Sequence, residues 1–72
     1  MTPEIQILEV VALIDDLPAK GLLRGQVGTV VERLATDAFE IEFSDDQGHT
    51  YAQFALHSRE LLELHDQPQQ AA

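Results

Sequence analysis

Hydrophobic and polar residues alternate most regularly in the segment 38–44, AFEIEFS. Every second residue there is apolar, and Glu40 and Glu42 fall between them. Successive side chains of a β-strand point to opposite faces, so this period of two predicts a strand with one buried and one solvated face. The residues expected on the buried face are Phe39, Ile41 and Phe43.

Four other short segments are rich in β-branched and aliphatic residues and are bounded by turn residues, which is typical of strands. They are residues 8–14, 26–33, 49–56 and 61–64. Residues 45–48 (DDQG) predict a hairpin loop, because Asp can bond its own backbone and Gly can adopt a left-handed conformation. Residues 57–60 predict a single helical turn. The alternative is a short helix over 58–65, because SRELLELH also fits two amphipathic turns.

Glycine and proline interrupt the pattern in two places. Residues 15–25 (DDLPAKGLLRG) are expected to form a long loop, and the leucines within it can anchor it over one end of a core. Gly28, inside the second predicted strand, indicates a bulge or a close approach of the backbone to a neighbour. A bulge would allow Val27 and Val30 to face the same side despite their spacing. The second strand is followed by a connecting loop at 34–37.

Five short strands, a long first loop, a hairpin and a one-turn helix before the last strand are the order of an SH3-like barrel. We therefore expect an all-β fold, a small five-stranded SH3-like barrel over residues 8–64. Residues 1–7 would be an N-terminal extension and 65–72 a flexible C-terminal tail. The alternative is an open five-strand sheet completed by dimerisation. The expected core residues are Val11, Leu13, Val27, Val30, Phe39, Ile41, Phe43, Phe54 and Leu61.

The stretch 9–32, EVVALIDDLPAKGLLRGQVGTVVE, resembles a family of small bacterial domains of unknown function. That family carries D/E-V-V-A-L, then D-L-P, then G-L-x-x-G-x-V-G-T-V-V, and AFEIEFSDDQGHTYA fits its later stretch. The resemblance runs from about residue 8 to 64. The family is similar to SH3-like and KOW-type barrels, which share the G-x-x-G-x-V element. The resemblance implies a fold, and it carries no established activity over to this chain.

Charge narrows the range of partners. The 72 residues carry 13 acidic and 4 basic side chains, a formal net charge of −9, and no cysteine. Nucleic acids and anionic membranes are bound through clustered cations, so both are disfavoured. The charge suits either solubility alone or attraction to a basic partner surface. We expect the partner to be another protein or a second copy of the chain. The N-terminus shows no targeting signal and the chain has no long apolar run, so we expect a cytoplasmic protein.

No arrangement of residues predicts catalysis, a metal site or a cofactor. The histidines fall in three different predicted elements, with no cysteine beside them. Glu40 and Glu42 project from an open strand face, which provides no cleft to raise a carboxyl pKa. Ser58 lies beside His57 with no third group for a triad. The glycines of 21–28 do not have a phosphate-binding spacing. We therefore expect no enzyme.

The sequence favours a non-enzymatic protein-interaction module, such as an accessory subunit or an antitoxin-like or immunity-like inhibitor of a basic partner. The alternative is a KOW-like RNA- or ribosome-associated factor. The residues expected to bind the partner are Leu17, Leu22, Leu23, Glu40, Glu42 and Tyr51. The long loop is expected to expose its three leucines beside the acidic strand face, and apolar anchors bordered by charge are typical of docking surfaces. Charge reversal at Glu40 and Glu42 is expected to weaken binding in a salt-sensitive way without unfolding the domain.

Overall fold

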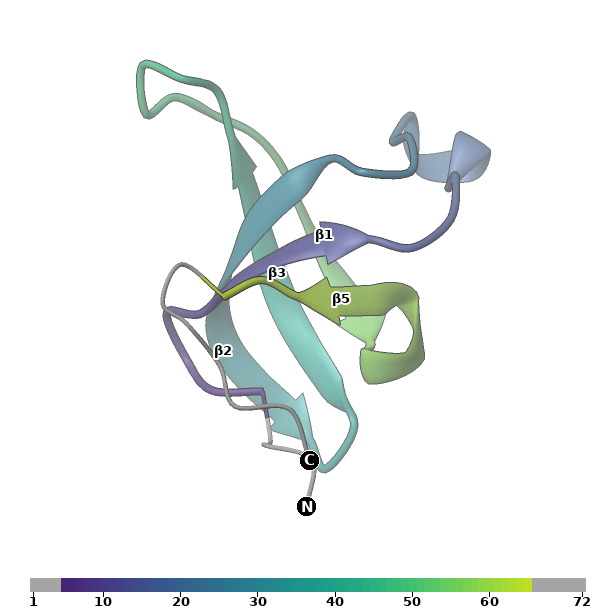
Figure 1. The fold of residues 1–72 in the computed structure, drawn as a ribbon, viewed down its shortest axis with the longest axis vertical. Helices are drawn as coiled ribbons and strands as arrows, with labels where there is room; N and C mark the ends of the chain where they lie inside the picture. Colours follow the sequence, from purple (N-terminus) through teal and green to yellow (C-terminus); the bar gives the residue numbers. More distant parts are fainter. Residues whose placement is uncertain (1–4, 66–72) are drawn as a thin grey trace.

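The computed structural model describes residues 5–65, which form one sheet of five antiparallel strands (Figure 1). The strands are β1 (Val10–Leu13), β2 (Val27–Ala35), β3 (Ala38–Ser44), β4 (Thr50–His57) and β5 (Leu61–Glu63), in the order β4-β3-β2-β1-β5. Two 3₁₀ turns accompany them, η1 (Pro18–Lys20) in the long first loop and η2 (Ser58–Glu60) before β5. The all-β class, the five strands and the one-turn helix before the last strand are confirmed.

β3 has the predicted bounds and the predicted alternation. Phe39, Ile41 and Phe43 are buried, and the residues between them are half-buried on the other face. β2 runs two residues past its predicted end and forms a tight hairpin with β3 through Thr36 and Asp37, where we expected a longer connection. β3 therefore turns one face of the sheet to the core and the other face, with Glu40 and Glu42, to the outside.

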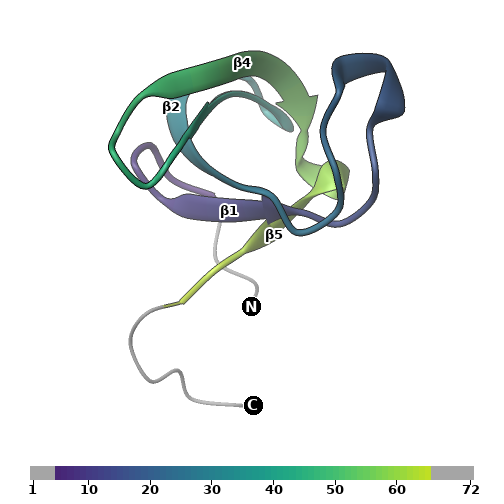
Figure 2. The ribbon, with the colours of Figure 1, turned by 90° about the horizontal axis from the view of Figure 1, so that it is seen from above.

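The sheet is strongly curved but is not closed into a barrel. Figure 2 shows the ribbon curling round until β4 lies across from β1 and β5. β4 and β5 remain the two edges of the sheet. The long loop lies at this opening, where the Lys20 ammonium nitrogen is 5.6 Å from the centre of the Phe54 ring. Side chains from the loop therefore cover part of the core that no strand covers.

Gly28 is a site of close approach and not a bulge. Val11 pairs with Gly28 in an unbroken register between β1 and β2. A Cβ atom at Gly28 would lie 2.6 Å from Ile41 Cγ2 and 3.0 Å from the Glu42 carbonyl oxygen on β3. The register of β2 against β3 shifts only beyond Val30. Only a residue without a side chain fits where Gly28 packs.

Because there is no bulge at Gly28, Val27 faces outward and is 46% exposed, so its prediction as a core residue is wrong. Phe54 is only partly buried against the core. The other seven predicted core residues are buried, including Val11 in preference to Val10. Leu22 and Leu56 complete the core cluster.

The chain after η2 is a strand, so the alternative of a helix over 58–65 is wrong. The His57 side chain accepts a hydrogen bond from the Arg59 amide, and the Glu60 side chain accepts one from the His57 amide. This reciprocal cap satisfies amides that a single turn leaves free. Leu61 then pairs with Leu13 of β1.

The predicted N-terminal extension (1–7) lies partly outside the described residues, and the predicted tail (65–72) lies outside them except for His65. Both boundaries stay predictions. Within residues 5–65, no helix is long and apolar enough to cross a membrane.

Candidate protein-binding surfaces

The three loop leucines have different environments. Pro18 opens η1 with its fixed φ, and Gly21 closes it at a φ of 69°. This turn brings Leu17 and Leu22 into a β-bridge, with the Leu17 amide 2.8 Å from the Leu22 carbonyl oxygen. Leu22 is 2% exposed and belongs to the core, so the prediction that it is exposed for a partner is wrong. Leu17 packs partly buried against the core, and Leu23 is 63% exposed.

Tyr51 lies with the loop and not with the acidic residues of β3. The register of β3 against β4 shifts beside it, which turns Tyr51 out of the alternation of β4. Its ring centre is 6.4 Å from that of the buried Phe43, and its hydroxyl accepts a hydrogen bond of 3.1 Å from Gln26 Nε2. The side-chain oxygen of Gln26, Oε1, in turn accepts a hydrogen bond from the Leu23 backbone amide. Tyr51 is half-exposed and joins the start of β4 to the long loop.

Glu40 and Glu42 lie on the outer face of β3, as predicted, and both are half-buried. Glu32 of β2 pairs directly opposite Glu40, so three carboxylates share this surface, the acidic face (Glu32, Glu40 and Glu42). No ion pair to any of the three is found among residues 5–65. Like charges directly opposite each other on a sheet are unfavourable. The acidic face therefore carries repulsion that the described residues do not relieve.

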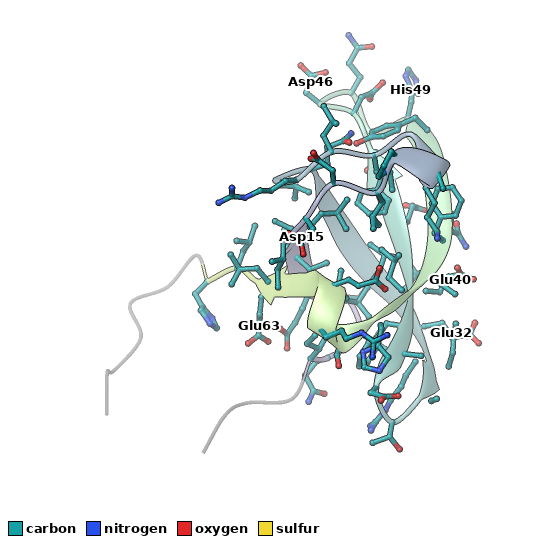
Figure 3. The ribbon with its side chains drawn as sticks, turned by 90° about the vertical axis from the view of Figure 1, so that its right-hand side faces the viewer. Asp15, Glu32, Glu40, Asp46, His49 and Glu63 are labelled. Atoms are coloured by element: carbon teal, nitrogen blue, oxygen red, sulfur yellow. The ribbon has the colours of Figure 1, made fainter. Side chains whose placement is uncertain are left out.

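The predicted interface is thus divided into two places. Leu23 and Tyr51 belong to the loop end, where Tyr51 contacts the inward-facing Phe43. Glu40 and Glu42 point to the outer side of the same sheet. Figure 3 shows Glu32 and Glu40 projecting together on the side away from β5 and Glu63. The two groups therefore lie on different sides of the sheet.

A second surface was missed by the sequence analysis, on the outer face of β2, β1 and β5. Ala12 pairs with Val27 on one side and with Leu62 on the other, which places three apolar residues in one row across the sheet. Val27 is 46% and Leu62 55% exposed, whereas the small Ala12 between them is only 8% exposed. Val10, two residues before Ala12 on the same face, is 42% exposed. We call these four residues the apolar row. In the sequence, uninterrupted alternation through Gly28 would have placed Val27 on the face opposite Val30. The unbroken register at Gly28 shows that this alternation holds.

The histidines each lie beside a single carboxylate. His57 Nε2, at the end of β4, is 2.8 Å from Oδ2 of Asp37 in the β2–β3 turn. His49 lies 3.6 Å from Asp45 in the hairpin loop, and His65 lies 3.7 Å from Glu63. No group of three or more metal-ligating side chains occurs in the described part of the chain. The His57–Asp37 contact ties η2 to the β2–β3 hairpin.

Glu63, at the end of β5, lies beside a second carboxyl group, that of Glu9. A side-chain hydrogen bond with Glu9 raises the pKa of Glu63, and burial and the negative charge of Glu9 raise it further, while His65 lowers it. The two carboxyl groups connect the segment before β1 with the end of β5. The pair lies away from both the acidic face and the loop end.

Comparison with known proteins places the chain in a family but assigns it no activity. No curated protein matches the chain. No solved structure matches it either. One family model matches residues 7–63, which is most of the chain and nearly the range over which the sequence resemblance was seen. The chain belongs to that family, described as Domain of unknown function (DUF4926).

Proposed function

We propose that this domain is a non-enzymatic module that binds another protein, and that the partner has a basic surface. The observation that carries the proposal is the apolar row, in which Val27, Ala12 and Leu62 lie side by side on the outer face of the sheet. Burying apolar surface contributes about 25 cal/mol for each Å² removed from water. Val10, Val27 and Leu62 are the exposed members of this row, and exposed apolar residues grouped on one face are typical of interaction surfaces.

The charge of the chain supports the choice of a basic partner. With a net charge of −9, the domain attracts cationic surfaces from a distance and repels anionic ones. A basic protein would gain association rate from this field and residence time from the apolar row. The partner relationship that we propose is that of an accessory subunit or an inhibitor covering a basic site.

The positions of the ionisable groups support a binding role over catalysis. Glu40 and Glu42 project from the convex side of the sheet, and the His49 side chain is 77% exposed in the hairpin loop. Acid–base catalysis relies on groups held in a site that excludes water and shifts their pKa.

An RNA-binding role receives less support from the same positions. Nucleic-acid binding relies on cations gathered on one surface. The four cations are spread over three elements: two lie in the long loop, one near the end of β2 and one in η2. One of the two loop cations is held over the Phe54 ring. The four are Lys20, Arg24, Arg33 and Arg59.

The proposal is tested by affinity capture with the tagged full chain in extract of the native cell, followed by mass spectrometry. The test variant carries Val27→Lys and Leu62→Lys in the apolar row. The matched control carries Ile7→Lys and Leu34→Lys, at two apolar residues that are 55% and 45% exposed outside the apolar row and outside the predicted interface. Both variants change the net charge equally.

We expect a basic protein to be captured by the wild type and the control and lost with the apolar-row variant. With the purified partner, the apolar-row variant should bind at least about tenfold more weakly, since buried anchors contribute most of the binding energy. Equal capture by both variants, or capture that disappears on ribonuclease treatment, would contradict the proposal.

A further inference from the structure

β4 is an edge strand of eight residues, TYAQFALH, with no acidic residue, lysine, arginine or proline. On one side it pairs with β3 along its whole length. On its other side, within residues 5–65, it forms no backbone hydrogen bond to the loop or to β5. Edge strands of proteins are usually short, charged or interrupted by proline, which prevents pairing with other chains. β4 has none of these protections along its middle.

The phase of the ladder shows which groups of β4 are free. The Ser58 amide donates to the Asp37 carbonyl oxygen at 2.8 Å, one residue beyond the Ala38–His57 pair. This bond makes Ala38–His57 a pair whose own backbone groups point away from each other, because the two kinds of pair alternate along an antiparallel ladder. Counting back by twos, Ala55 and Gln53 also direct their amides and carbonyls to the free edge.

The same two residues lie next to the acidic face. Ala55 pairs with Glu40 and Gln53 pairs with Glu42, and both are exposed on the outer side. A strand added to β4 would place a residue opposite Ala55 with its side chain on this outer side, about 5.5 Å away between Cα atoms. Glu40 is about 4.5 Å further on. The small Ala55 side chain between them leaves room for a lysine or arginine to reach the carboxylate.

The inner side of the edge favours an apolar residue. Phe54 faces the core between Gln53 and Ala55 but is only partly buried, although it is among the largest side chains of the chain. Its exposed side is bordered by the flexible Lys20 side chain and not by a strand. An apolar residue of an added strand, opposite Phe54, would cover this part of the core.

We propose that β4 is a strand-addition site for an extended segment of another protein with the alternation basic, apolar, basic. The basic residues would lie opposite Gln53 and Ala55 and meet Glu42 and Glu40, and the apolar residue would cover Phe54. A second copy of β4 lacks these cations and would bring two chains of −9 together. The inference rests on β3 and β4 and does not depend on the apolar row, so either proposal can fail alone.

The probe is a seven-residue peptide of alternating lysine and valine with blocked ends, added to the full chain at low salt. Hydrogen exchange followed by NMR reads each amide separately. We expect the Gln53 and Ala55 amides to exchange quickly in the free protein and at least about tenfold more slowly with saturating peptide. A peptide whose lysine residues carry a methyl group on the backbone amide nitrogen cannot form the ladder. It should not protect the Gln53 and Ala55 amides from exchange. A peptide with glutamate in place of lysine should not bind.

The carboxylates are tested with two variants of equal charge. Glu40→Gln with Glu42→Gln should weaken peptide binding about three- to tenfold, as expected for two partly exposed ion pairs. Asp15→Asn with Asp46→Asn removes the same charge from exposed positions of the long loop and the hairpin loop, outside the acidic face, and should change binding less than about twofold. Peptide binding without slower exchange at Gln53 and Ala55, or equal weakening by both variants, would overturn the proposal. So would protection of these amides by the protein alone at high concentration, because a second copy would then be the occupant.

Discussion

At Gly28 the backbone of β2 passes so close to β3 that the space for a side chain is filled by Ile41 and by the Glu42 carbonyl. Ile41 is completely buried, so it cannot move aside without disturbing the core. Gly28→Ala should therefore lower the free energy of unfolding by about 1–3 kcal/mol, the usual effect of overpacking. Urea unfolding measures this change. Val27→Ala, next in the chain but outward-facing, should cost only about 0.5 kcal/mol. Equal effects at both positions would show that the close approach is not limiting.

The carboxyl pair of Glu9 and Glu63 gives the molecule a dependence on pH. Because the hydrogen bond with Glu9 raises the pKa of Glu63 in the folded state, the folded state binds a proton more tightly than the unfolded chain. This stabilisation is present below the ordinary pKa of 4.5 and is lost as the pH rises through the folded-state value.

Glu63→Gln keeps a hydrogen-bonding group without the charge. Relative to the wild type, it should therefore be more stabilising at pH 7 than at pH 3, as measured by urea unfolding at both values. Asp46→Asn in the exposed hairpin loop removes the same charge without this neighbour and should show a smaller trend, due only to the net charge. A trend for Glu63→Gln no larger than that for Asp46→Asn would contradict the effect of Glu9.

Among the elements, β3 contributes most to the core, and it is the strand between two long neighbours. Phe43 is completely buried beside Ile41, whereas Phe54 of β4 is partly exposed at the edge. Phe43→Ala should cost about 3–5 kcal/mol, which is enough to unfold so small a domain. Phe54→Ala should cost clearly less and leave a folded chain. Circular dichroism with thermal unfolding distinguishes the two, and a folded, equally stable Phe43→Ala protein would contradict the assignment of the buried face.

For the whole molecule, the excess of acidic residues is an energetic cost. The described part extends 36 × 27 × 21 Å. The screening length is about 30 Å at 0.01 M salt, so charges repel one another across the whole domain, and about 3 Å at 1 M. Sodium chloride over this range should therefore raise the midpoint of thermal unfolding.

A variant with less negative charge provides the control for this effect. Glu32→Lys and Asp46→Lys each raise the net charge by two, so the double variant has a net charge of −5 in place of −9. Its midpoint should rise less with salt than that of the wild type. An equal rise in both proteins would assign the effect to the salt and not to repulsion.

Local patterning predicted the five strands and the turn before the last one, but neither η1 nor the last two residues of β2. The alternation of residues 38–44 and the breakers around the other segments are properties of neighbouring residues, and they determined the strands, the hairpin and the turn before β5. They also placed Phe39, Ile41 and Phe43 inside and Glu40 and Glu42 outside, because side chains of a strand alternate whatever it packs against.

The remaining features depend on residues far apart in the chain, and the folded structure was needed to see them. The close contact of Gly28 with β3 turned Val27 outward, and the β-bridge between Leu17 and Leu22 buried a residue expected to be exposed. The apolar row exists only because Ala12 lies between strands that are distant in sequence. Likewise, the free edge of β4 follows from strand order, since a segment's own residues do not determine which strands lie beside it.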